Sequence, residues 1–100
     1  MDSKLADALW ALRAHEPDLR RRGIIHASIF GSVARGQTGP ESDIDVLVDL
    51  DPAHQMGVFE YARLELDLGT ILGSSCDLVN RDTLDPFLRE SILRETIDAF

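Results

Sequence analysis

The chain has 100 residues, of which 44% are hydrophobic and 28% are charged, as is usual for a soluble globular protein. These values predict one domain over residues 1–100. Its formal net charge of −8 argues against loose binding to a nucleic-acid backbone, which requires clustered cations. No apolar run reaches 18 residues and Cys76 is the only cysteine, so we expect no membrane span, no internal disulfide and a cytoplasmic location.

The first third of the chain predicts two helices and a strand. Residues 3–14 carry leucines at helical spacing, and a short helical turn is expected over 18–22, with Gly23 as its stop. Three arginines at 20–22 form the only basic cluster. We favour a solvated helix end, and contact with a phosphate or an acidic surface is the alternative. The apolar residues 24–30 predict the first strand.

The rest of the chain predicts two more strands, over 42–50 and 75–80, and two helices, over 57–72 and 83–97. Apolar side chains alternate with acids in the second strand, so we expect helices to cover one face of the sheet. Pro86 is tolerated only in the first turn of the last helix. The result is an α/β domain with at least three strands. The expected core includes Trp10, Val58, Tyr61, Leu64, Leu68, Ile71, Leu72, Cys76, Leu84, Phe87, Leu88 and Ile92.

Two aspartates, Asp43 and Asp45, stand at the start of the second strand. Residues two apart on a strand share a face, so their Cα atoms should lie roughly 6.5 Å apart. Two carboxylates on one face repel each other unless a cation lies between them. Such a pair can share two divalent cations, which lie about 3.5–4 Å apart in two-metal sites. Carboxylate oxygens suit Mg²⁺ together with substrate phosphates, so this spacing indicates metal-nucleotide chemistry.

The pair Gly31-Ser32 follows the first strand directly. A glycine lets the backbone approach a ligand closely, and amides at the start of a helix suit phosphate. Gly-Ser is also an ordinary turn pair, and the aspartates downstream favour the functional interpretation. A P-loop is the rival, with a second glycine at Gly36. We reject it because Gln37 stands where the P-loop requires a lysine.

Taken together, Gly31-Ser32, ten intervening residues and Asp43-Ile44-Asp45 resemble the signature of the polymerase-β-like nucleotidyltransferases. The fuller string adds Ala34-Arg35-Gly36 and Ser42, and it resembles the minimal MNT-type branch, the MntA-like antitoxins. The similarity extends to the Cys76-Asp77-Leu78-Val79 and Leu93-Arg94-Glu95 segments.

The resemblance implies a mixed, mostly antiparallel sheet and a set of site residues. Gly31 and Ser32 would hold the phosphates of ATP, the expected donor. Asp43 and Asp45 would bind two Mg²⁺ ions. Asp77 would be the third catalytic carboxylate, as a ligand of one ion and the general base for an attacking hydroxyl.

Arg35 follows the Gly-Ser turn by three residues. It could reach a phosphate or an acidic partner, or it could be a solvated helix residue. We include it among the candidate nucleotide-binding residues.

The resemblance also implies a partner, because the larger members of the superfamily add domains for which this chain has no room. The expected partner is a HEPN-domain RNase toxin that forms a hetero-oligomer with the chain. One of its tyrosines would receive AMP, which would silence the toxin. Two alternatives stay open: an antitoxin that neutralises its partner by binding alone, and adenylylation of a small-molecule hydroxyl.

Overall fold

The computed structural model describes residues 3–37, 39 and 43–100 of the chain. The elements before the candidate site residues Asp43 and Asp45 are α1 (Ser3–Ala14), α2 (Glu16–Arg21), β1 (Ile24–Phe30) and α3 (Gly31–Ala34). Those after are β2 (Ile44–Leu50), α4 (Val58–Leu72), β3 (Cys76–Asn80), the 3₁₀ helix η1 (Arg81–Thr83), α5 (Pro86–Glu95) and β4 (Ile97–Asp98). Residue 42, where the second strand was expected to begin, lies outside the described residues.

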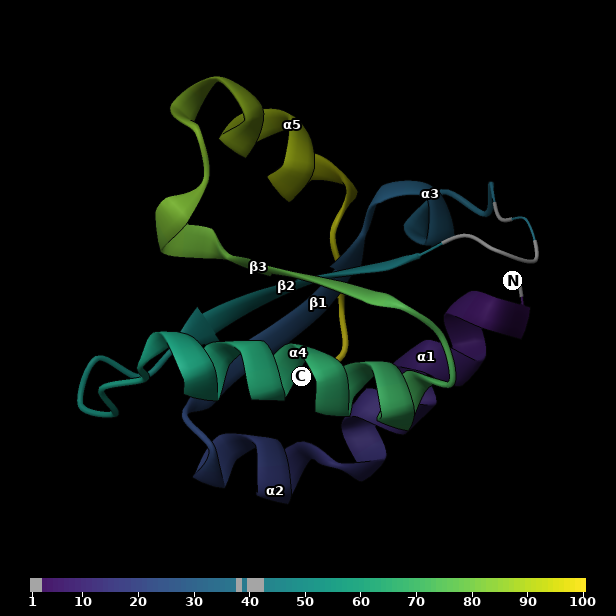
Figure 1. Ribbon diagram of the computed structural model, residues 1–100. Helices are drawn as coiled ribbons and strands as arrows, with labels where there is room; N and C mark the ends of the chain where they lie inside the picture. Colours follow the sequence, from purple (N-terminus) through teal and green to yellow (C-terminus); the bar gives the residue numbers. More distant parts are fainter. Residues whose placement is uncertain (1–2, 38, 40–42) are drawn as a thin grey trace.

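The four strands form one mixed sheet in the order β3-β2-β1-β4. Strand β1 pairs antiparallel with both β2 and β4, whereas β2 and β3 are parallel and are connected through α4. Figure 1 shows α1, α2 and α4 on one side of the sheet and α5 on the other, with α3 at the end of β1. The predicted α/β fold, with a mostly antiparallel sheet and helices over one face, is confirmed.

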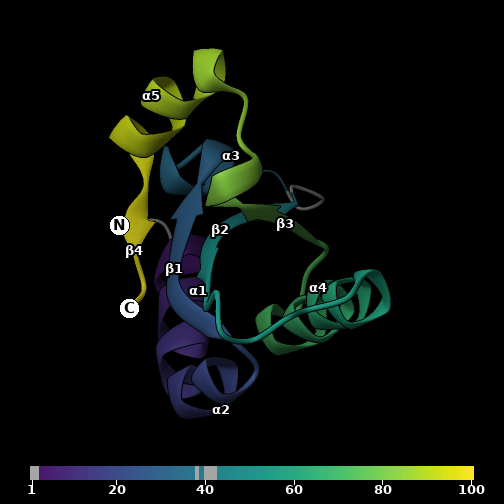
Figure 2. The ribbon, with the colours of Figure 1, turned by 90° about the vertical axis from the view of Figure 1, so that its left-hand side faces the viewer.

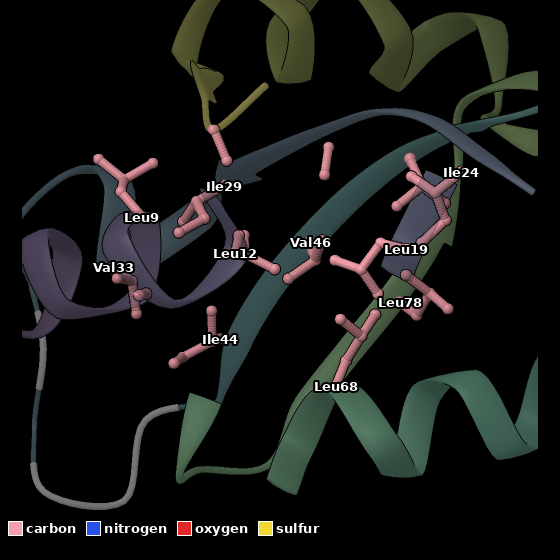
Figure 3. Packing of buried hydrophobic residues seen from close by; sticks show 14 of the residues in the cluster. Leu9, Leu12, Leu19, Ile24, Ile29, Val33, Ile44, Val46, Leu68 and Leu78 are labelled. Atoms are coloured by element: carbon pink, nitrogen blue, oxygen red, sulfur yellow. The ribbon is translucent and has the colours of Figure 1, made fainter. Parts of the chain in front are cut away.

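The hydrophobic core lies between the sheet and the helices α1, α2 and α4 (Figure 3). Alternate residues of β2 enter it, because successive side chains of a strand point to opposite faces. The fully buried members include Leu12, Leu19, Ile24, Ile29, Ile44, Val46, Leu64 and Leu68. This packing fixes the register of β2, so that the acids of the same strand point away from the core.

Several predicted helix bounds needed correction. Helix α2 begins at Glu16 and not at residue 18, since proline fits the first turn of a helix and Pro17 stands there. The last helix is shorter than predicted, because the Asp85 side chain caps the amide of Phe87 at 2.9 Å and Thr96 is already extended. The chain then forms β4, a strand that was not predicted. Helix α4 ends at Leu72, as predicted, and Gly73 follows it in the left-handed conformation.

Four residues assigned to the core are exposed instead. Trp10 is 73% exposed and lies off the buried face of α1, while Val58 is 83% exposed at the first position of α4. Phe87 and Leu88 are 93% and 56% exposed, because α5 lies on the side of the sheet away from the core. Tyr61 is half-buried and donates a hydrogen bond from its hydroxyl to the carbonyl of Leu78 at 2.8 Å.

The three arginines of the basic cluster form ion pairs within the chain. Arg20 pairs with Glu16 at 2.7 Å, Arg21 with Asp18 at 2.9 Å and Arg22 with Asp67 at 3.0 Å. The guanidinium of Arg20 also lies over the ring of Phe100, 5.1 Å from its centroid. These contacts support the structural interpretation of the cluster.

None of the helices in the described part of the chain has the length and apolar character needed to cross a bilayer.

Candidate active site

Gly31 marks the point where β1 passes into α3, and its backbone lies directly against β2. The residue has φ +75°, a conformation that side chains rarely adopt. A Cβ atom added there would lie 2.1 Å from Oδ2 of Asp45. Phe30, the residue before it, pairs with Asp45 in the sheet. The glycine is therefore required both by the backbone conformation and by the close approach of a site carboxylate.

The three predicted aspartates come together at one end of the sheet. Asp45 is the register partner of Asp77 in the parallel pair of β2 and β3, so both carboxylates lie on the same face. Asp43 is exposed just before β2. The pKa of Asp45 is raised above its usual value, mainly by partial burial and then by the negative charges of Asp77 and Asp43. The clustered charges make this end of the sheet a place for cations.

A fourth carboxylate, Glu95, enters the site from the end of α5. Its Oε1 accepts a hydrogen bond from the amide of Gly31 at 3.2 Å, and its Oε2 pairs with Nη1 of Arg35 at 2.7 Å. Arg35 also lowers the pKa of Asp45, and Glu95 raises it. The neighbours of Glu95 along the chain indicate no role for it, because only the return of the chain through α5 brings residue 95 to Gly31. The one signal was its presence in a segment that resembles the family.

The donor set fits a magnesium ion that shares its ligands with a substrate. In the described part of the chain, no group of three or more His, Cys, Asp or Glu side chains is positioned to hold a metal ion alone. Mg²⁺ commonly takes one or two carboxylates together with substrate phosphates and water. Neighbouring parallel strands lie about 4.8 Å apart, which brings Asp45 and Asp77 close enough to share such an ion. The residues present therefore fit the metal only in combination with phosphate oxygens.

Ser32 and Gln37 show how the turn after Gly31 closes. The amide of Gln37 donates to the carbonyl of Ser32 at 2.9 Å, and the Gln37 side chain accepts from Nε of Arg35 at 3.0 Å. Ser32 itself is half-buried in the first turn of α3, beside Gly31. Gln37 thus orients Arg35.

Two other acids of the same region, Asp49 and Asp51, lie outside the cluster. Asp49, at the far end of β2, lies 2.9 Å from Nε of Arg81. Asp51 accepts a hydrogen bond from the amide of Ala53 at 2.9 Å, which is the usual way an aspartate stabilises a turn. Both therefore have structural roles.

Cys76 gives a test of the packing beside the site. The residue begins β3 and packs against the core, and burial together with the nearby Glu65 and Asp77 raises the pKa of its thiol to about 12. Because only the thiolate reacts readily, we expect iodoacetamide at pH 8 to alkylate the native protein at least about tenfold more slowly than the protein in urea. Mass spectrometry of samples taken over time measures the two rates of alkylation. Equal rates would contradict the buried position.

Comparisons with known proteins agree with this geometry. The sequence matches the nucleotidyltransferase domain family over residues 12–99. Protein adenylyltransferase MntA of Thermococcus cleftensis is 34% identical over 87 residues, which cover 86% of this chain and 86% of that protein. A Methanocaldococcus jannaschii protein, named as a candidate protein adenylyltransferase, is 35% identical over 83 residues, which cover 83% of this chain and 87% of that protein.

Solved structures show the same arrangement of elements. One of them, described as a candidate minimal nucleotidyltransferase, is 40% identical to this chain, with a TM-score of 0.75. The matched region covers 97% of this chain and 95% of that chain. A toxin-antitoxin structure with AMP-PNP shares the fold at 22% identity, with a TM-score of 0.68 over 96% of this chain and 72% of that one. The chain is therefore a nucleotidyltransferase and belongs to the nucleotidyltransferase domain family.

Proposed function

We propose that this chain is a magnesium-dependent protein adenylyltransferase that transfers AMP from ATP to a hydroxyl of a HEPN-domain toxin and so acts as its antitoxin. The observation that carries the proposal is the approach of Asp43 and Asp77 to Asp45, whose carboxylate lies directly against Gly31. Relatives over most of the chain are named protein adenylyltransferases. A neighbour in fold is described as a tri-AMPylated Shewanella oneidensis HEPN toxin in complex with an MNT antitoxin.

The proposed transfer is an in-line substitution at the α-phosphorus of ATP. The hydroxyl oxygen of the acceptor, which we propose to be a tyrosine, forms a bond to that phosphorus. The bond from the phosphorus to the oxygen bridging to the β-phosphate breaks, and pyrophosphate leaves. The carboxylate of Asp77 takes the proton of the acceptor hydroxyl as general base. Asp77 suits this role because its side chain is exposed and lies beside Asp45.

Each remaining site residue has a proposed part in holding ATP. The Gly31 amide, Ser32 and the guanidinium of Arg35 would bind the phosphates, as donors that match phosphate oxygens. Asp43, Asp45 and Asp77 would hold two Mg²⁺ ions when the nucleotide is bound. When bound, the metal would neutralise the charge that develops on the phosphate oxygens.

The proposal is tested with the protein, Mg-ATP and the HEPN-domain product of an adjacent gene. Intact mass spectrometry should show the partner gaining the mass of one or more AMP units. We expect Asp43→Asn to abolish the gain, because it removes one metal-binding carboxylate. Asp51→Asn is the matched control and should retain it, since asparagine can still accept the turn hydrogen bond from Ala53. No mass gain with the unaltered protein would contradict the proposed transfer.

The same proteins distinguish transfer from neutralisation by binding alone. Under our proposal, the double variant Asp43→Asn, Asp45→Asn binds the partner but no longer suppresses its RNase activity. Suppression by this variant equal to that of the unaltered protein would show that binding alone is sufficient.

A further inference from the structure

The side chain of Glu95 occupies the position in which the proposed function requires a phosphate. We propose that Glu95 is an internal competitor of the nucleotide's phosphates, and that its displacement makes the site selective for metal-bound polyphosphate. The inference rests on the proposed nucleotide site and adds a specificity-determining residue to it.

The contacts of Glu95 are those of a bound anion. One carboxylate oxygen lies 3.2 Å from the amide nitrogen of Gly31, and the other lies 2.7 Å from Nη1 of Arg35. A backbone amide and a guanidinium are the donors that proteins use for phosphate, and their hydrogen bonds to an ionised acceptor are the strong kind. Any phosphate that binds to Gly31 and Arg35 must therefore first replace both contacts of Glu95.

The neighbouring carboxylates make this replacement depend on a cation. The charges of Asp43, Asp77 and Glu95 all act on Asp45. If an anion displaced Glu95 from Arg35 without a metal ion, one more negative charge would be unpaired among these acids, at a cost in free energy. A divalent cation bound by the aspartates removes this repulsion. Phosphate that arrives together with magnesium is therefore favoured over phosphate that arrives alone.

The helix that carries Glu95 is attached in a way that permits the exchange. None of the ten residues of α5, all of which the structure describes, is fully buried, and Phe87 is 93% exposed. Figure 2 shows α5 beside α3 and apart from α1, α2 and α4, the helices that cover the core. The ion pair of Glu95 with Arg35 joins the last residue of α5 to the residue that follows α3. Moving Glu95 away from Gly31 thus disturbs little packing.

Calorimetric titration with pyrophosphate tests the role of Glu95. Without magnesium, we expect Glu95→Gln to bind pyrophosphate at least about tenfold more tightly than the unaltered protein, as expected for loss of a competing charge-assisted hydrogen bond. With saturating magnesium the difference should fall to within about threefold. Glu90→Gln is the matched control from the same helix, because Glu90 pairs with Arg94 within α5. It should bind like the unaltered protein in both conditions.

A second measurement uses the unaltered protein and so does not depend on the folding of a variant. In NMR spectra, magnesium with pyrophosphate should shift both the Gly31 amide and the side-chain carboxyl carbon of Glu95, since the two groups separate. A shift at Gly31 with no change at Glu95 would overturn the inference. Equal magnesium-free affinities of the Glu95→Gln variant and the unaltered protein would also overturn it. Failure of every variant to bind Mg-ATP would instead contradict the proposed nucleotide site.

Discussion

Replacing Asp45 by asparagine is expected to reduce nucleotidyl transfer by about 10²–10³-fold, a loss typical of removing one transition-state-stabilising group. The negative charges of the other site acids all act on Asp45. Asparagine has the same shape but no charge, so it would hold a cation poorly. The measurement is the initial rate of AMP incorporation into the partner with saturating Mg-ATP. A rate within about tenfold of that of the unaltered protein would contradict the assignment of Asp45.

The same substitution is expected to stabilise the fold. The pKa of Asp45 is raised in the folded state, so the folded protein holds this proton more tightly than the unfolded chain. The carboxyl group therefore favours folding while it is protonated at low pH, and this contribution is lost as the pH rises above the usual value of 3.8. At pH 7 the ionised Asp45 destabilises the fold, and asparagine removes that cost.

Thermal unfolding of both proteins in metal-free buffer measures this effect. Solvent screens this partly exposed carboxylate, so we expect a gain of at most about 1 kcal/mol, which would raise Tm by at most roughly 4–8 °C at pH 7. The gain should shrink as the pH approaches 4. The control is Asp49→Asn on the same strand, which weakens the ion pair with Arg81 and should not raise Tm. If Asp45→Asn lowered Tm at pH 7, repulsion within the cluster would not be the dominant effect.

Gly31→Ala is the second substitution with a large expected effect. The φ of +75° costs a residue with a Cβ roughly 1–2 kcal/mol. In addition, the new atom would meet Oδ2 of Asp45 at 2.1 Å, so a carboxylate of the proposed active site would have to move. We expect a loss of about 2–4 kcal/mol in the free energy of unfolding and at least about a 10²-fold loss of transfer.

Gly36→Ala separates the two causes of this effect. Gly36 also has a positive φ, of +73°, but a Cβ added there would meet no atom of the neighbouring residues that the structure describes within 4 Å. The Gly36→Ala variant should therefore lose only the roughly 1–2 kcal/mol in the free energy of unfolding that the backbone conformation costs. It should retain most of the transfer activity. Urea unfolding together with the transfer assay compares the two variants. Equal losses of transfer would contradict the importance of the close approach of Gly31 to Asp45.

The sequence by itself predicted the features that depend on neighbours along the chain. The spacing of Asp43 and Asp45 determined that the two acids share a face, because the period of a strand is two residues. The pair Gly31-Ser32 marked the turn before them, and the resemblance carried by these residues indicated the family. The leucines of α1 and the stop at Gly73 predicted two helices to within a residue or two.

Only the tertiary structure decided which distant residues meet at the site. The parallel register of β2 and β3 places Asp77 beside Asp45, and the return of the chain through α5 brings Glu95 to Gly31 and Arg35. Periodicity also assigned Phe87 and Leu88 to the core, where they do not lie. A hydrophobic pattern shows which face of a helix is apolar, but the neighbouring elements decide whether that face is covered.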